Sequence, residues 1–138
     1  MHLRTLIRGL LIGGALLAAP ARGPHPSSRN GMSYFKHHVF FCCNQRAAGE
    51  SCCNDHKASA LQTYAKERTA ALGLKGKGSV RVNKAGCLGR CDDGPVIVVY
   101  PDNVWYTYVD KEDIDEIIDS HLLNGRVVER LRLAEDAR

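Results

Sequence analysis

The sequence lacks several features that would indicate common classes of protein. No apolar run reaches the roughly 18 residues expected of a membrane-spanning helix. Residues 32–138 also lack net charge, because four of the 19 Lys and Arg residues precede Met32 and the remaining 15 match the 15 Asp and Glu residues. A nucleic-acid-binding surface needs clustered positive charge. We therefore expect neither a membrane protein nor a nucleic-acid-binding protein.

Residues 1–31 differ in composition from the rest of the chain. Basic residues come first, an apolar stretch follows over residues 10–19, and Ala19-Pro20-Ala21 resembles the cleavage site of a secretory signal. We expect an unstructured or signal-like extension, and we favour a translation start placed too early, with Met32 as the natural start. That interpretation predicts a cytoplasmic protein, whereas a true signal over residues 1–21 would predict export. The folded domain is expected over residues 32–133, followed by a frayed tail at 134–138.

Cysteine is the residue type that carries the chemical information. Six cysteines occur at three places: Cys42-Cys43, Cys52-Cys53, and the pair Cys87 and Cys91. Such a set indicates disulfides, a metal site or redox chemistry. Disulfides are typical of small, loop-rich proteins from oxidising compartments, whereas this chain has strand and helix patterns long enough to form a core. Metal or cluster binding is therefore the favoured interpretation.

The apolar periodicity predicts an α/β fold. Short runs rich in β-branched and aromatic residues predict strands at 37–41, 80–83, 96–100 and 104–109. Helical spacing predicts one helix from Asn54 to Gly73 and a second from Asp110 to Asn124. This order gives a thioredoxin-like arrangement, a four-stranded mixed sheet flanked by two main helices, with a parallel first crossover.

Two further expectations concern the C-terminal part of the domain. His121 falls on the apolar face of the second helix, where a histidine is more often packed in the core than used as a ligand. Val127, Val128 and Leu131 are expected to dock the chain that follows this helix.

The cysteines lie on two loops, each next to a strand, and can supply four thiolates. Four cysteine thiolates are the ligands of a two-iron, two-sulfide cluster, so an iron–sulfur cluster is expected. The second loop contains Gly86, Gly89 and Gly94, whose backbone amides can approach sulfur closely. Arg46 and Arg90 lie within the two loops and either favour the reduced cluster electrostatically or point into solvent. Side chains of adjacent cysteines point in different directions, so two of the six cysteines are expected not to be cluster ligands.

Three stretches, in this order, resemble the thioredoxin-like [2Fe-2S] ferredoxins of the Shethna-protein type: Phe40 to Arg46, Gly86 to Pro95, and Val98 to Tyr106. The resemblance covers about Met32 to Leu133. It implies Cys42, Cys53, Cys87 and Cys91 as cluster ligands, with Cys52 as a possible replacement for Cys53. Cys43 and Lys57 depart from the family's usual residues, and Lys57 stands where glycine is common. The resemblance also implies a homodimer with one cluster per subunit.

The leading hypothesis is a [2Fe-2S] ferredoxin, a one-electron carrier between redox partner proteins rather than an enzyme. A structural zinc site with four cysteine ligands is an alternative, although only Cys87 and Cys91 have the short spacing of a zinc knuckle. A thiol–disulfide oxidoreductase is disfavoured because no C-x-x-C motif occurs. An accessory cluster-carrying subunit or a cluster-trafficking protein is a further alternative. His37, His38 and His56 lie near the cysteine loops and are interpreted as ordinary strand or helix-start residues.

Overall fold

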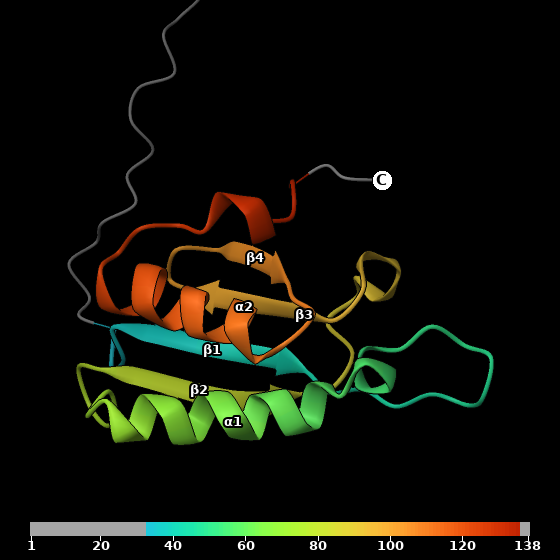
Figure 1. Cartoon of the computed structure of the whole chain (residues 1–138), viewed down its shortest axis with the longest axis horizontal. Helices are drawn as coiled ribbons and strands as arrows, with labels where there is room; N and C mark the ends of the chain where they lie inside the picture. The colour runs from blue at the N-terminus through green and yellow to red at the C-terminus, as the bar shows by residue number, and fades with distance from the viewer. Residues whose placement is uncertain (1–32, 136–138) are drawn as a thin grey trace, which may run out of the picture. The chain divides into compact units, whose positions relative to one another are not determined.

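A four-stranded mixed sheet forms the centre of the molecule, with strand order β2-β1-β3-β4 (Figure 1). The structure is a computed structural model that describes residues 33–135. The expectations for residues 1–31 and for the last three residues of the tail therefore lie outside the described residues. Strand β1 (His37–Cys42) pairs in parallel with β2 (Val80–Ala85). Its other neighbour is β3 (Val96–Tyr100), which runs antiparallel to β1 and to β4 (Val104–Thr107).

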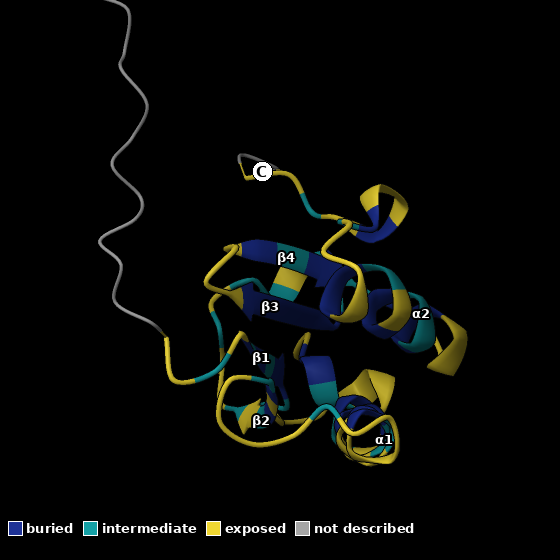
Figure 2. Cartoon of the chain, turned by 90° about the vertical axis from the view of Figure 1, so that its left-hand side faces the viewer, coloured by how far each residue is buried: buried dark blue, intermediate teal, exposed yellow. Residues whose placement is uncertain are grey.

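Both main helices cover the same face of this sheet, as Figures 1 and 2 show together. Helix α1 (Ala58–Ala71) connects the parallel strands β1 and β2, and α2 (Lys111–Glu116) follows β4. The Asp110 side chain caps α2 by accepting a hydrogen bond from the backbone N–H of Asp113 at 3.1 Å. The chain then continues as a wider, π-type helix over Ile117–Leu123. The expected sheet and its two helices are present.

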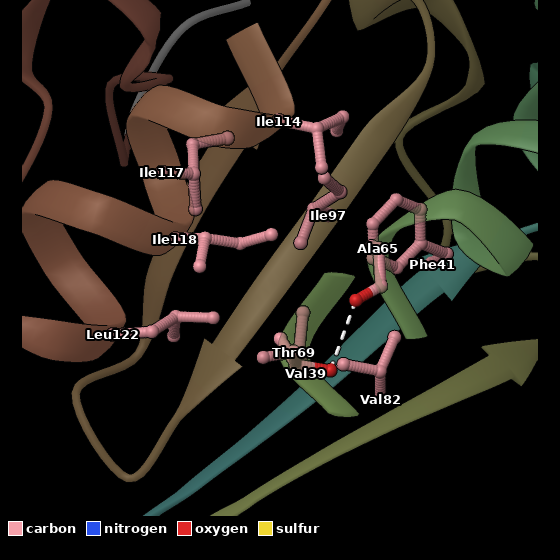
Figure 3. Close-up of a pocket in the computed structure, with 10 residues that line it drawn as sticks. All are labelled: Val39, Phe41, Ala65, Thr69, Val82, Ile97, Ile114, Ile117, Ile118 and Leu122. Atoms are coloured by element: carbon pink, nitrogen blue, oxygen red, sulfur yellow. Dashed lines mark hydrogen bonds between the residues drawn. The ribbon is translucent and has the colours of Figure 1, made fainter. Parts of the chain in front are cut away.

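The core lies between the sheet and the two helices. In Figure 3, apolar side chains from α2 and the π-type segment point across to Val39, Phe41 and Ile97 of the sheet. Thr69 belongs to the same group, and its hydroxyl donates to the carbonyl of Ala65 one turn earlier in α1 at 2.9 Å. Alternation along β1 explains this arrangement, because every second side chain of a strand points to the same face.

Several element boundaries differ from the prediction, and three of the differences affect the course of the chain. The region expected to start a helix at Asn54 first forms a short 3-10 turn, Cys53–His56, and Lys57 then takes a left-handed backbone conformation (φ 60°) before α1 begins. The Asn54 side chain accepts from the Ser59 N–H at 3.0 Å, which satisfies a donor at the start of α1. β4 ends at Thr107 instead of Val109, and the second helix changes to the π-type form after Glu116.

The face of the sheet away from the helices carries aromatic side chains. His38 and Phe40 stack with ring centroids 4.1 Å apart, and the Tyr100 side chain at the end of β3 is 42% exposed. Val98 on this face is only 2% exposed. Its cross-strand neighbours are Phe40 and Trp105, whose large side chains cover it.

The segment after the second helix returns to the sheet. Val128 and Leu131 are buried and Val127 packs against the core, as expected. The backbone N–H of Leu133 donates to the carbonyl of Trp105 at 2.8 Å. Among the described residues, no helix is both long and apolar enough to cross a membrane.

Candidate metal centre

The two cysteine-bearing loops, residues 43–52 and 86–94, lie at one end of the sheet, on the right in Figure 1. The topology explains why they meet. β1 and β2 are parallel, so their C-terminal ends lie side by side, and antiparallel β3 begins at the same end. Cys42 is the last residue of β1, and Cys53 opens the 3-10 turn that precedes α1.

Three contacts link the sulfur atoms and the two loops. The Sγ atoms of Cys87 and Cys91 are 3.3 Å apart. One guanidinium nitrogen of Arg46, on the first loop, donates to both of them, at 3.6 Å to Cys87 and 3.3 Å to Cys91. The Cys53 thiol donates to the carbonyl of Gly94, on the second loop, at 3.4 Å.

Burial divides the four thiols into an inner and an outer pair. Cys42 and Cys53 are each only 1% exposed and share an apolar group with Ala58 and Val96. Cys87 is exposed and Cys91 is half-buried. An ion or cluster held by all four would therefore be screened from water on the inner side and accessible on the outer side.

The thiol pKa values report the same proximity. Burial, followed by a hydrogen bond with the Cys42 thiol, raises the pKa of Cys53 to about 12, and Cys91 adds to the rise. The pKa of Cys91 is raised mainly by its hydrogen bond with Cys87, then by burial, with Cys42 also contributing. The pKa of Cys87 is lowered by hydrogen bonds from the Gly89 backbone, Cys91 and Arg46. Each of these sulfurs is thus sensitive to charge on the others.

The other two cysteines point elsewhere. Cys43 packs partly against the main core, and burial raises the pKa of its thiol, beside Ser59. The Cys52 sulfur accepts a hydrogen bond from the Gln45 side chain at 3.3 Å, and it also lies within hydrogen-bonding reach of Asp55. Cys42 and Cys53 thus share one apolar group, against which Cys43 also packs, while the sulfurs of Cys87 and Cys91 contact each other on the second loop.

The two loop arginines have different roles. Arg46 contacts sulfur directly. Arg90 instead forms an ion pair with Asp93 at 2.6 Å, lies 5.4 Å from the Trp105 ring centre, and donates to the carbonyl of Ala134 at 3.0 Å. It connects the second loop to the C-terminal segment and makes no sulfur contact in the described part of the chain.

The glycines of the second loop also differ from one another. The Gly89 N–H donates to the Cys87 sulfur at 3.4 Å, which is the amide contact expected from the sequence. Gly94 uses its carbonyl for Cys53, adopts φ +82°, and would bring a Cβ to 3.3 Å from the Thr107 hydroxyl oxygen. Gly86 makes no comparable sulfur contact within residues 33–135.

Sequence reasoning missed one residue at this site. The Tyr108 hydroxyl is buried and has no hydrogen-bond partner within the described residues. Burial raises the pKa of this phenol, and the nearby Cys43, Cys53 and Cys42 raise it further. Its place just after the predicted hairpin strand gave no signal of a polar role. An orphan donor beside a set of thiols is consistent with acceptor atoms, such as sulfur, that occupy the site when it is loaded.

The geometry and donor set are those of a sulfur-ligated metal centre, and comparison with known proteins identifies the family. The family profile described as thioredoxin-like [2Fe-2S] ferredoxin matches residues 35–122, a range that includes both cysteine loops. The chain belongs to the thioredoxin-like [2Fe-2S] ferredoxins.

Related ferredoxins support this identification. The 2Fe-2S ferredoxin of Clostridium pasteurianum is 39% identical over 102 residues, which cover 71% of this chain and 96% of the relative. The 2Fe-2S ferredoxin of Aquifex aeolicus (strain VF5) is 37% identical over 107 residues, or 75% of this chain and 94% of the relative. The crystal structure of the wild-type thioredoxin-like [2Fe-2S] ferredoxin from Aquifex aeolicus has a TM-score of 0.63 at 35% identity, covering 72% of this chain and 97% of that one.

Membership of this ferredoxin family gives the chain its cofactor, a [2Fe-2S] cluster, and its general role, iron–sulfur electron transfer. The thioredoxin-like fold expected from the element order is confirmed. The residues at the site fit the cofactor, because such clusters are held by cysteine thiolates and the two cysteine loops meet here through Arg46 and through the contact between Cys53 and Gly94.

Proposed function

We propose that this ferredoxin carries single electrons between redox partner proteins and holds its cluster with Cys42, Cys53, Cys87 and Cys91. The observation that supports the ligand assignment is the 3.3 Å contact between the sulfurs of Cys87 and Cys91, both hydrogen-bonded to Arg46 from the opposite loop. Cys42 and Cys53 are assigned with them because they are buried together at the same end of the sheet. Cys52 is not assigned as a ligand, because its sulfur is hydrogen-bonded to Gln45.

The protein's own residues have three tasks in this function. Cys42 and Cys53 provide the inner ligands and lie among apolar side chains that exclude water. Cys87 and Cys91 lie on the outer side, where a partner protein can approach. The positive charge of Arg46 offsets the negative charge of the thiolates, which repel one another. The cluster, when bound, supplies a reversible one-electron couple, and no bond in a substrate needs to be made or broken.

The test is a set of six single Cys→Ser variants, purified anaerobically and analysed for iron, sulfide and zinc. Serine at positions 42, 53, 87 or 91 is expected to abolish the cluster or to change its visible and electron paramagnetic resonance (EPR) spectra. Serine at positions 43 or 52 is expected to leave both spectra unchanged, and these two variants are the matched controls. Loss of the cluster in Cys52→Ser with retention in Cys53→Ser would contradict the assignment. A zinc-loaded, colourless wild-type protein would contradict the electron-transfer proposal.

We also propose that the protein is a homodimer that buries the helix-free face of the sheet. That face presents Phe40, Tyr100 and Trp105, and none of the described helices covers it (Figure 2). Apolar and aromatic area that remains exposed on one side of a sheet is a common feature of protein–protein interfaces.

A cytoplasmic location is a further proposal. It is supported by the chemistry of the site, because free cysteine thiols persist in reducing compartments and are readily oxidised outside them. Cell fractionation with an antibody to the folded domain tests it, and recovery in an exported fraction would contradict it.

A further inference from the structure

A second group of potential metal ligands lies at the end of the sheet opposite to the cysteine loops. His37 is the first residue of β1, Asp102 lies in the turn between β3 and β4, and His121 lies in the π-type helix. At the usual rise of a strand, the five steps from His37 to Cys42 span about 17 Å. This group is therefore separate from the cluster site.

The three side chains converge on one point. Asp102 Oδ2 is 2.6 Å from His121 Nε2 and 3.2 Å from His37 Nε2. The three candidate ligand atoms all lie within 4.8 Å of one another. The two imidazole rings are inclined at 68° with centroids 5.4 Å apart, so they approach the carboxylate from different directions.

The two histidines of this group are buried, whereas its aspartate faces solvent. His37 and His121 are 5% and 1% exposed, whereas the Asp102 side chain is 38% exposed. An ion could therefore enter past Asp102 and meet two buried histidine nitrogens. The exposed side leaves room for water as an additional ligand.

One atom of this group has no hydrogen-bond partner. His37 Nδ1 is buried, and nothing within residues 33–135 pairs with it. The apolar side chains that otherwise face this core would fill the same position without that cost, so packing alone does not account for the histidine. The histidine is therefore retained for its other ring nitrogen, Nε2, which faces Asp102.

Tyr106 provides the support that a histidine ligand needs. Its hydroxyl oxygen is 2.8 Å from His121 Nδ1 and accepts from the Val128 N–H at 3.1 Å. A phenolic oxygen can accept two hydrogen bonds. With an ion on Nε2, the His121 proton moves to Nδ1 and is donated to Tyr106, which is the usual support for metal-bound histidine.

We propose that His37 Nε2, Asp102 Oδ2 and His121 Nε2 form a binding site for a divalent transition-metal ion of the Zn²⁺ class, separate from the cluster. Two imidazoles and one carboxylate with a position left for water form a common donor set for such ions. Metal–ligand distances of about 2.0–2.2 Å in a tetrahedral site correspond to ligand atoms roughly 3.3 Å apart. The contact between His37 and Asp102 already has this length, and the contact between His121 and Asp102 must widen. The two histidine nitrogens, which lie within 4.8 Å of each other, must come closer.

The test uses the cluster-loaded, oxidised full chain with Co²⁺ as the probe. The intact cluster occupies the four proposed ligand cysteines, and in its oxidised form it gives no EPR signal, so a high-spin Co²⁺ signal that His37→Ala or Asp102→Asn removes reports the second site. Equilibrium dialysis gives the stoichiometry, with one Co²⁺ per chain expected and displacement by Zn²⁺. We expect His37→Ala and Asp102→Asn each to weaken binding at least about tenfold.

The matched control is His38→Ala. His38 is adjacent in sequence but points to the other face of the sheet, where its ring lies 3.2 Å from the Asn83 side-chain oxygen. This variant is expected to bind Co²⁺ like the wild type. Wild-type protein without stoichiometric binding, or equal binding by Asp102→Asn and wild type, would overturn the proposal. The cluster spectrum shows that each variant is folded, and Asp102→Asn at an exposed turn keeps the test decisive if His37→Ala does not fold.

Discussion

Among single residues, Arg46 is the side chain whose charge acts most directly on the candidate cluster ligands. It is the cation bonded to Cys87 and Cys91, and the pKa of its guanidinium is raised by these sulfurs in return. A positive charge beside the cluster stabilises the reduced form, which carries more negative charge. Arg46→Gln should therefore lower the reduction potential by roughly tens of millivolts, a small change because the site is solvated.

Spectroelectrochemical titration measures this effect. Arg46→Lys retains the charge and should restore most of the potential, whereas Arg81→Gln removes a charge from β2, away from the loops, and serves as the control. Equal shifts in Arg46→Gln and Arg81→Gln would mean that the direct contact with sulfur has no special effect.

The thiols of the apoprotein should differ in their reactivity. The pKa of Cys87 is lowered by the Gly89 amide, Cys91 and Arg46, and its sulfur is exposed. The pKa of Cys53 is raised to about 12 by burial and by Cys42. Because the thiolate is the reactive form, iodoacetamide at pH 7.5 should label Cys87 first and Cys53 among the last. Peptide mass spectrometry after short exposure gives the order, and faster labelling of Cys53 than of Cys87 would contradict this account.

The sequence was sufficient to predict which kinds of residue form the site, but it could not predict how each side chain points. The cysteine spacing and the family resemblance selected Cys42 and Cys53, which the structure buries in one apolar group. The roles of Arg46 and Arg90 could not be separated from sequence, because both lie in irregular loops. Tertiary contacts with Asp93 and Ala134 turn Arg90 away, while Arg46 is left free to reach the sulfurs.

At the level of the secondary-structure elements, the residue before α1 has a strained backbone conformation that a substitution can relieve. Lys57 has φ 60° and is exposed, so its side chain is not needed for packing. This left-handed conformation costs an L-residue roughly 1–2 kcal/mol and costs glycine little. Lys57→Gly is therefore expected to stabilise the fold by about 1 kcal/mol, after part of the gain is lost to the greater entropy of unfolded glycine. Chemical denaturation of the cluster-loaded protein measures the change.

Ala60 provides the control for this substitution. It is an exposed residue inside α1, where glycine replaces a good helix former and has no left-handed conformation to relieve. Ala60→Gly should destabilise the protein by about 0.5–1 kcal/mol. If both glycine variants lowered stability equally, strain at Lys57 would not be the explanation.

Most elements followed from the periodicity of the sequence, and the exceptions have local causes. β3 was predictable because all its residues except the last are buried and apolar. The break at Lys57, between the 3-10 turn and α1, could not be predicted, because lysine gives no signal of a left-handed conformation. The change to a π-type helix after Glu116 was also not predictable, since the apolar spacing of Ile117, Ile118 and Leu122 fits both helix forms.

For the whole molecule, the proposed homodimer gives a direct prediction. Phe40→Glu places a charge in the middle of the helix-free sheet face, and burying that charge without a partner is costly. The wild-type protein should elute with twice the mass of one chain in light scattering, and Phe40→Glu should elute with the mass of one chain while retaining its cluster. Val109→Glu is the control, because Val109 is 83% exposed and lies outside that face. A wild-type monomer would contradict the proposal.

The order of elements was enough to predict the fold as a whole, but it did not predict which distant residues meet. His37, Asp102 and His121 belong to a strand, a turn and a helix that are far apart in sequence. Their convergence depends on the pairing of β1 with β3 and on the packing of the second helix across that end of the sheet. Each histidine alone was indistinguishable from an ordinary core residue.

The connection between Arg90 and the carbonyl of Ala134 has a practical consequence for engineering. Because the second cysteine loop holds the chain at that point, a flavin or photosensitiser domain fused to the C-terminus would be tethered only four residues beyond it. A C-terminal fusion should thus deliver electrons through a shorter distance than a donor domain fused directly to residue 33, near the start of β1 at the opposite end of the sheet.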